Sequence, residues 1–304
     1  MITVFTPTYN RANTLPKLYF SLLKQNYKNF EWVIVDDGSI DDTQEIVKSW
    51  IEEKKINIIY HKKTNGGKHR AINKGLEIAN GELFFIVDSD DYLLDSSLSI
   101  VDKYYQDIKD DKTIIGVTGF RCFPNNQIIG GKLFPQDVLD SNLIERRQKY
   151  NVIADLAHVL KTDIFKQYLF PDIPGENFVA ESIVWNRIAL DYKMRYFNEA
   201  IYVGGYLEGG LSNNSIKNRR INSKYSTLLY KELVDNNVSN IKVKFKAAIN
   251  YWRFAFCRKE NIFKLLMEIK NFQYSLVSLP IGFFFYLKDS INSEIKVNSL
   301  NNER

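Results

Sequence analysis

The stretch that decides the fold runs from Glu82 to Asp91 and reads ELFFIVDSDD. Its apolar run, Leu83–Val87, is too short to span a membrane and is typical of a strand that is buried on both faces. Asp88, Asp90 and Asp91 follow at once, and clustered carboxylates are costly to desolvate unless a cation neutralises them. Ligands of open α/β sheets collect beyond the carboxyl ends of the strands, so the stretch predicts a metal and phosphate site there.

The oxygen ligands of this cluster suit Mg²⁺ or Mn²⁺, and Mg²⁺ commonly shares its site with substrate phosphates. A plainer alternative is that Asp90 and Asp91 cap the next helix, which the sequence places near Asp95. The other motifs of the chain indicate whether Asp90 and Asp91 belong to a cation site or cap a helix.

The bulk composition is that of an ordinary soluble protein. The 304 residues are 45% hydrophobic and 25% charged, which suits one large α/β domain with an appendage or two small domains. The N-terminus already has the pattern of a strand, so we expect no signal peptide. Cys122 and Cys257 match no zinc or redox spacing, which indicates a reducing compartment.

Residues 1–91 alternate between strand and helix patterns. Strands are expected at Ile2–Thr6, Glu31–Asp36 and Ile56–Tyr60, and helices from Asn13, from Ser39 and over Lys68–Ala79. This alternation with short connections predicts an α/β fold whose open, mostly parallel sheet is flanked by helices. Its carboxyl edge would bring together Pro7–Asn10, Asp36–Asp37, Asn65–Lys68 and Asp88–Asp91.

The later part of the chain is less regular. The sequence predicts a helix at Leu98–Ile108, a strand at Ile114–Phe120, an irregular polar region over 123–150, a helix at Phe178–Tyr192, a strand at Arg195–Tyr206 and a flexible polar loop at Glu208–Asn214. From Lys217 onward the pattern is helical, basic and aromatic.

Two of the polar clusters have both a plain and a functional interpretation. Asp36-Asp37-Gly38-Ser39 is a plain strand-to-helix turn, or its carboxylates accept the imide N–H of uracil with the Tyr9 ring near the base. Asn65–Ala71 is neither a P-loop nor a G-x-G-x-x-G motif. Lys68 at its loop-to-helix junction would still favour a diphosphate through its charge and the helix N-terminus.

Four motifs, in this order and spacing, resemble the family 2 glycosyltransferases with the GT-A (nucleotide-diphospho-sugar transferase) fold. They are Pro7–Arg11, Val35–Ser39, Asn65–Gly75 and Val87–Asp91. The resemblance continues more weakly in Asp155–Val159 and Glu181–Arg187. It implies a glycosyltransferase domain over 1–215, with a nucleotide-binding half at 1–95 and an acceptor half at 96–215, followed by a helical extension at 216–304.

The resemblance also implies roles for individual residues. Those implied to bind the nucleotide sugar are Pro7, Thr8, Tyr9, Asn10, Asp36, Asp37, Lys68, Asp88 and Ser89. By the family pattern, Asp36 or Asp37 binds uracil and Asp88 binds the ribose or the metal. Asp90 would bind the divalent metal, Mn²⁺ or Mg²⁺, on the diphosphate.

The catalytic base is where this chain departs from the family pattern. Many members have Glu-Asp at the acceptor-side helix, with the Asp as base, whereas this chain has Glu181-Ser182. Either Glu181 takes the role or Asp155 does, and the plain alternative makes Glu181 a solvated acid at a helix start. The implied reaction is an inverting displacement, in which a carboxylate deprotonates the acceptor hydroxyl and the metal stabilises the departing UDP.

The C-terminal helices require a separate interpretation. The net charge of +5 is unevenly distributed, because Lys217–Lys259 contains eleven Lys and Arg residues against two acids. Basic and aromatic residues on amphipathic helices indicate binding to an anionic membrane surface. The alternative is a helical subdomain that packs on the sheet or on a second subunit of a homo-oligomer. The apolar run Tyr274–Leu287, interrupted by Pro280, is too short to span a bilayer comfortably.

Together these observations predict a cytoplasmic enzyme, peripheral on the inner face of the cell membrane, that moves a sugar from a UDP-sugar to a hydroxyl of a growing surface glycan. The resemblance implies bacterial polysaccharide biosynthesis, and the basic, aromatic C-terminal segment is compatible with a lipid-linked acceptor. No nucleic-acid-binding signature is present. The alternative function is a catalytically degenerate GT-A scaffold in a membrane glycan-assembly complex, which only the Glu181-Ser182 departure supports.

Overall fold

The computed structural model describes residues 1–205 and 215–302, with no side-chain description for Gln148 and 293–302. The predicted loop at Glu208–Asn214 therefore lies outside the described residues. The chain divides into two compact units. The first unit comprises Met1–Phe170 and Ala180–Leu207, and the second comprises Pro171–Val179 and Glu208–Arg304.

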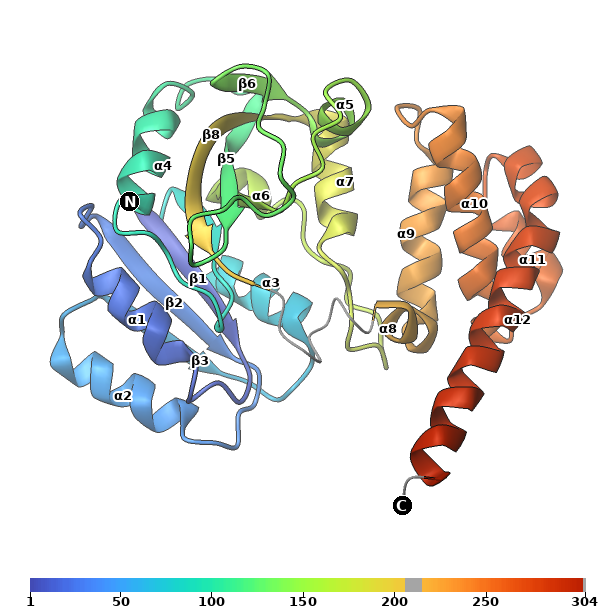
Figure 1. Cartoon of the computed structure of the whole chain (residues 1–304), viewed down its shortest axis with the longest axis horizontal. Coiled ribbons are helices and arrows are strands. Elements are labelled where there is room, and N and C mark those ends of the chain that lie inside the picture. Colours follow the sequence, from blue (N-terminus) through green and yellow to red (C-terminus); the bar gives the residue numbers. More distant parts are fainter. Residues whose placement is uncertain (206–214, 303–304) are drawn as a thin grey trace. The chain divides into compact units, whose positions relative to one another are not determined.

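The first unit is built on one mixed sheet with the strand order β3-β2-β1-β4-β7-β5-β8-β6 (Figure 1). The strands are β1 (Ile2–Thr8), β2 (Phe30–Asp36), β3 (Ile58–Lys62), β4 (Leu83–Ile86), β5 (Ile114–Cys122), β6 (Val138–Ser141), β7 (Leu156–Lys161) and β8 (Lys193–Val203). Strands β1 to β4 pair in parallel, as do β5 and β8. Strand β7 lies antiparallel between β4 and β5, and β6 is antiparallel to β8. The predicted α/β fold with a mostly parallel sheet is confirmed.

Seven helices accompany this sheet in the described part of the first unit. They are α1 (Leu15–Leu23), α2 (Thr43–Glu53), α3 (Lys68–Ile78), α4 (Ser97–Gln106), α5 (Leu143–Gln148), α6 (Thr162–Phe165) and α7 (Ser182–Asp191). The predicted helix starts at Asn13 and Ser39 are wrong, because Thr14 and Asp42 occupy the N-cap positions. The polar region 123–150 is also more ordered than expected, since it contains β6 and α5.

The helix-capping interpretation of the central carboxylates is wrong as well. Helix α4 begins at Ser97, and its N-cap residue is Ser96. Asp91 instead accepts a hydrogen bond from the Tyr202 hydroxyl of β8, at 2.7 Å. The carboxylates after β4 therefore belong to the edge of the sheet and not to the following helix.

Aromatic packing holds the layers of the first unit together. On one face, Tyr19 of α1 stacks on Trp50 of α2 at 4.3 Å between ring centroids, and Trp32 of β2 lies beneath them. On the other face, helix α3 approaches β1 so closely that a Cβ at Gly75 would lie 2.1 Å from the Phe5 ring. Only glycine permits this contact, which sets the position of Lys68 at the start of the same helix.

The second unit is helical, as the sequence predicts. It contains α8 (Ser215–Ile221), α9 (Ser223–Asp235), α10 (Ile241–Ala255), a 3-10 turn at Phe256–Arg258, α11 (Ile262–Met267) and α12 (Phe272–Asn302). Helix α10 packs between α9 and α12 and contributes the buried Tyr251 and Trp252 to the core of this unit. Among the described residues, no helix is both long and apolar enough to cross a membrane.

The predicted helix at Phe178–Tyr192 begins later than expected, because the preceding segment belongs to the second unit. The Glu176 carboxylate accepts the backbone N–H groups of Lys224 and Tyr225, both at 2.8 Å. The Asn222 side chain accepts those of Asn177 and Phe178. These bonds attach Pro171–Val179 to the start of α9, so the helix in the first unit starts only at Ser182.

The environment of His158 on β7 predicts that the stability of the fold depends on pH. His158 contacts the Thr118 hydroxyl and packs against Trp185, and burial, together with nearby arginines, lowers its pKa to about 3. Below pH 6.5 the imidazole of His158 becomes protonated in the unfolded chain but stays neutral in the folded chain. The free energy of unfolding therefore falls as the pH drops toward 3. We expect wild type to lose about 1–2 kcal/mol between pH 7.5 and pH 5 through this group, and His158→Gln to lose correspondingly less, as measured by urea unfolding. Equal losses in both proteins would contradict this role.

Candidate functional site

The parallel strands β1, β2 and β4 bring three of the predicted clusters to one edge of the sheet. In the register, Thr8 lies beside Asp36, and Phe5 lies beside Ile86. The chain segments that follow these strands carry Tyr9, Asp37 and Asp88, and α3 begins at the same edge with Lys68. The structure thus brings together the sequence-predicted residues of the nucleotide-binding half.

Asp36 and Asp37 shape the loops at this edge. The buried Asp36 carboxylate accepts the Ser39 N–H at 2.7 Å and the Tyr60 hydroxyl at 2.5 Å. Asp37 accepts the backbone N–H groups of Gly66 and Gly67 and the Lys63 ammonium, at 2.6–2.9 Å. Asp37 therefore ties the loop before α3 to the end of β2.

Gly38 permits this attachment. Its φ is +89°, and a Cβ there would lie 2.9 Å from the backbone nitrogen of Asn65. Both the left-handed conformation and the close approach favour glycine. The turn after β2 and the loop before α3 are consequently held in contact.

The segment after β1 is joined to the turn after β2. Asn10, with a φ of 52°, donates its N–H to the Ser39 hydroxyl and accepts the Ile40 N–H through its side chain. Pro7 and Thr8 are buried within β1, whereas the Tyr9 ring is 47% exposed. Tyr9 is therefore the member of this predicted set whose side chain is available to a ligand.

Lys68 connects the two halves of the predicted site. Its ammonium lies 2.6 Å from Asp88 Oδ1 and 2.9 Å from Glu181 Oε1. Burial alone would lower the pKa of Lys68, but the two carboxylates raise it above its ordinary value. The Lys68 ammonium thus holds the Asp88 carboxylate, after β4, beside the Glu181 carboxylate, which precedes α7.

Sequence reasoning missed Arg121 and Tyr202, which complete this cluster. The Arg121 guanidinium lies 4.0 Å from the centre of the Tyr202 ring and 3.9 Å from both Asp88 and Asp91. The Tyr202 hydroxyl donates to Asp91 and accepts the Asp88 N–H at 3.0 Å. Both residues lie on the paired strands β5 and β8, so their position at the carboxyl end of a parallel pair is the signal that could have found them.

The electrostatics differ among the three carboxylates. Burial raises the pKa of Asp88, but Lys68 and Arg121 lower it by more, so it lies below its ordinary value. Burial raises the pKa of Asp91 to about 6, although the hydrogen bond from Tyr202 by itself would lower it. Asp90 lies 3.4 Å from Arg11. Three cations therefore share the charge of the Asp88–Asp91 segment.

Of the two remaining predicted residues, Ser89 is buried and Asp155 has an exposed side chain. The Ser89 carbonyl accepts the Thr14 hydroxyl at 3.0 Å. Asp155 precedes β7, and its carbonyl accepts the Arg121 N–H. The chain of Asp155 thus runs beside Arg121, and Ser89 supports the loop that carries Asp88 and Asp90.

The donor set suits a hard divalent cation that is shared with a ligand. Among the described residues, no group of three or more His, Cys, Asp or Glu side chains is arranged to hold a metal by itself. Asp88 and Asp90 supply partly exposed carboxylates. Mg²⁺ sites commonly use one or two such carboxylates, with substrate phosphates completing the shell.

The fold is of the GT-A type, in which the parallel strands β1 to β4 are joined through the antiparallel strand β7 to the paired strands β5 and β8. The model of glycosyl transferase family 2 matches residues 3–160. The chain belongs to this family of enzymes.

Individual relatives agree with this assignment. The chain is 26% identical to the glycosyltransferase GlyG of Streptococcus pneumoniae over 67% of its length and 70% of the relative's. The structure of S. aureus TarS 1-349 in complex with UDP-GlcNAc superposes with a TM-score of 0.66 at 18% identity, over 96% of this chain and 92% of that one. Within a longer TarS structure this chain spans only 53%.

A second solved structure extends the fold comparison. The mannosyltransferase PcManGT from Pyrobaculum calidifontis, in complex with GDP-Man and Mn²⁺, superposes with a TM-score of 0.53 at 18% identity. The alignment covers 95% of this chain and 87% of that one.

The Tyr202 hydroxyl gives a direct test of how the cluster is held. Tyr202→Phe leaves the Asp88 N–H without its acceptor and Asp91 without its donor, so we expect a loss of about 1–3 kcal/mol in the free energy of unfolding. Urea unfolding measures the loss. The matched change Tyr9→Phe, at a side chain 47% exposed, should stay within about 0.5 kcal/mol of wild type. Equal effects of the two changes would argue against the cluster.

Proposed function

We propose that the protein is a metal-dependent, inverting glycosyltransferase that moves a sugar from a UDP-sugar to a hydroxyl of a growing surface glycan. The observation that carries the proposal is the double ion pair of Lys68. It brings a carboxylate suited to the metal, Asp88, and a candidate base, Glu181, to the same point at the end of a parallel sheet.

The donor would lie across the carboxyl edge of β1, β2 and β4. The exposed Tyr9 ring would stack on the base, and Asp36 or Asp37 would accept the uracil imide N–H. Lys68, at the first position of α3, would bind the diphosphate through its charge and the helix N-terminus. The TarS complex with UDP-GlcNAc supports a UDP-sugar, while the GDP-Man complex of PcManGT means that the fold alone does not select uracil.

Asp90 and Asp88 would hold a divalent cation, Mn²⁺ or Mg²⁺, together with the donor diphosphate. The bound metal would stabilise the negative charge that develops on the departing UDP. Arg11 and Arg121, which pair with these carboxylates, would lie beside the same phosphates.

Glu181 is the base that the geometry favours, and Asp155 is the second candidate. When Lys68 pairs with the diphosphate, Glu181 is left to accept the proton of the acceptor hydroxyl. The hydroxyl oxygen forms its bond to the anomeric carbon as the bond to the UDP oxygen breaks, so the configuration at that carbon inverts. The proton ends on Glu181 and the electron pair on UDP.

The acceptor would be a lipid-linked glycan, and the enzyme would work as a peripheral protein on the inner face of the cell membrane. The basic, aromatic composition of the C-terminal helices supports this location. A homo-oligomer would be compatible with the same helices.

Nucleotide binding tests the metal site. A ligand that binds only the folded state raises the melting temperature. We expect UDP with Mn²⁺ to raise that of wild type by several degrees, UDP alone to raise it less, and Asp90→Ala to abolish the metal-dependent part. The matched change Asp110→Ala, at an exposed acid beyond α4, should retain the full shift. No shift in wild type with UDP and Mn²⁺ would refute the proposed donor site.

Substitution of the two candidate bases tests the catalytic assignment. Glu181→Gln keeps a hydrogen-bonding side chain beside Lys68 but cannot take up a proton, so we expect transfer to fall by about 10²–10⁴-fold while the UDP-induced shift persists. Asp155→Asn should leave transfer within about threefold of wild type. Transfer kinetics with a panel of UDP-sugars measure both variants. The opposite ranking would assign the base to Asp155, and UDP binding without turnover of any sugar would favour a scaffold.

A further inference from the structure

In the described part of helix α12, several polar side chains are buried and several large apolar side chains are exposed, although Tyr274 and Leu279 pack against the core of the second unit. Ser275, Ser278 and Asp289 are buried, whereas Val277, Phe284 and Ile291 are 57–64% exposed. A helix on the surface of a soluble domain normally shows the opposite arrangement. The outer side of α12 is therefore a candidate interaction surface.

The contacts with α10 fix this orientation. The Trp252 indole donates to the carbonyl and hydroxyl of Ser275, at 2.8 and 3.1 Å. A Cβ at Gly282 would lie 2.4 Å from the Cβ of Trp252, so the two helices touch through a glycine. The Asp289 carboxylate accepts hydrogen bonds from Nε and Nη2 of Arg253, at 2.6 and 2.7 Å. Rotating α12 to bury its apolar side would break these contacts.

Helix α11 also exposes large apolar side chains, although its Leu265 is buried in the core of the second unit. Its Phe263 and Met267 side chains are 76% and 79% exposed. We call the exposed large apolar side chains of residues 262–291 the outer face; they are Ile262, Phe263, Met267, Phe272, Leu276, Val277, Ile281, Phe283, Phe284, Leu287 and Ile291. A patch of this extent on a soluble protein marks an interaction surface.

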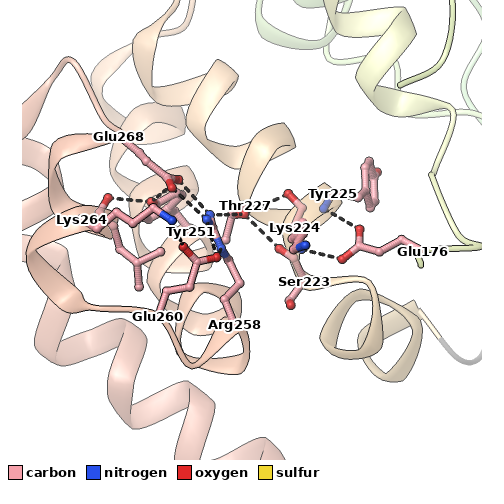
Figure 2. Close-up of polar contacts among 11 residues, drawn as sticks. Glu176, Ser223, Lys224, Tyr225, Thr227, Tyr251, Arg258, Glu260, Lys264 and Glu268 are labelled. Carbon is pink, nitrogen blue, oxygen red and sulfur yellow. Dashed lines mark hydrogen bonds and ion pairs between the residues drawn. The ribbon is translucent and has the colours of Figure 1, made fainter. Parts of the chain in front are cut away.

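Each acidic residue between 259 and 292 forms an ion pair with an arginine. Arg258 pairs with Glu260 and with Glu268, where Tyr251 also donates, as Figure 2 shows. Asp289 pairs with Arg253 and Arg220. The exposed charges of this segment are consequently lysines.

These lysines accompany the outer face. Lys259, Lys264, Lys270 and Lys288 are exposed. Among the residues whose side chains are described, only Lys264 of these four pairs with an acid, Glu260. Lys288 lies on α12 one turn from both Phe284 and Ile291. The surface is thus apolar and cationic at once.

We propose that the outer face binds the interfacial region of a lipid bilayer that contains anionic lipids. The phenylalanines and aliphatic side chains would enter the boundary between headgroups and acyl chains, and the lysines would contact the anionic headgroups. A second copy of the chain is disfavoured as the occupant, because an isologous contact would oppose lysine to lysine without an exposed acid in this segment to compensate.

This inference deepens the proposed membrane location and rests on it, but not on the donor chemistry. It makes the second unit the membrane-binding part of the chain. A failure of UDP binding would refute the transferase site alone. A failure of vesicle binding would refute the outer face and the membrane location but not the transferase site.

Flotation of the full-length protein with vesicles tests the proposal. We expect it to bind vesicles of phosphatidylcholine mixed with phosphatidylglycerol, and to bind pure phosphatidylcholine much more weakly. Val277→Ser combined with Phe284→Ser should weaken binding by about tenfold or more, and Lys288→Gln by about fivefold. The matched controls are Phe20→Ser on α1, 58% exposed, and Lys48→Gln on α2, which should bind as wild type does.

Two outcomes would overturn the proposal. One is vesicle binding that Val277→Ser with Phe284→Ser reduces no more than Phe20→Ser does. The other is a lack of binding to either vesicle. If the protein is then a dimer in light scattering that the same double substitution converts to a monomer, the outer face is an interface between copies.

Discussion

The candidate site depends on one constraint, which is that carboxylates gathered at a sheet edge must be neutralised. Lys68 meets it by pairing with Asp88 and Glu181, at 2.6 and 2.9 Å, so residues from both halves of the first unit come together around one ammonium. Helix α3 presents this ammonium because Gly75 lets the helix lie directly on Phe5. The packing of a glycine thereby determines where the charge is held.

Carboxylates are paired with cations in both units, but the ion pairs differ in what they leave exposed. At the sheet edge the cations and carboxylates are partly exposed, so a metal and a diphosphate could exchange with the ion pairs. In the second unit, Arg253 and Arg258 hold Asp289, Glu260 and Glu268 against the helices. The first arrangement suits the binding of an anionic substrate, and the second leaves a surface of lysines and apolar side chains.

Much of the first unit could be predicted from the chain because its signals are local. The apolar run at Leu83–Val87 and the strand-helix alternation before it predict β1 to β4, and the clusters after them fall at one edge because parallel strands end together. Helix starts were less predictable. The N-cap of α1 is Thr14 and not Asn13, and the N-cap of α2 is Asp42 and not Ser39. Pro171–Val179 joined the second unit through hydrogen bonds to α9, which residue patterns do not encode.

The sequence by itself determined the alternation of strands and helices in residues 1–91, the resemblance to the family, and the residue types that could bind a metal and a diphosphate. Only the tertiary structure decided that Arg121 and Tyr202 join Asp88 and Asp91, because their proximity comes from the pairing of β5 with β8 across eighty residues of chain. It also decided which side of α12 is buried. Serines and an aspartate face α10 because Trp252 and Arg253 hydrogen-bond to them, and such partners cannot be read from the periodicity of one helix.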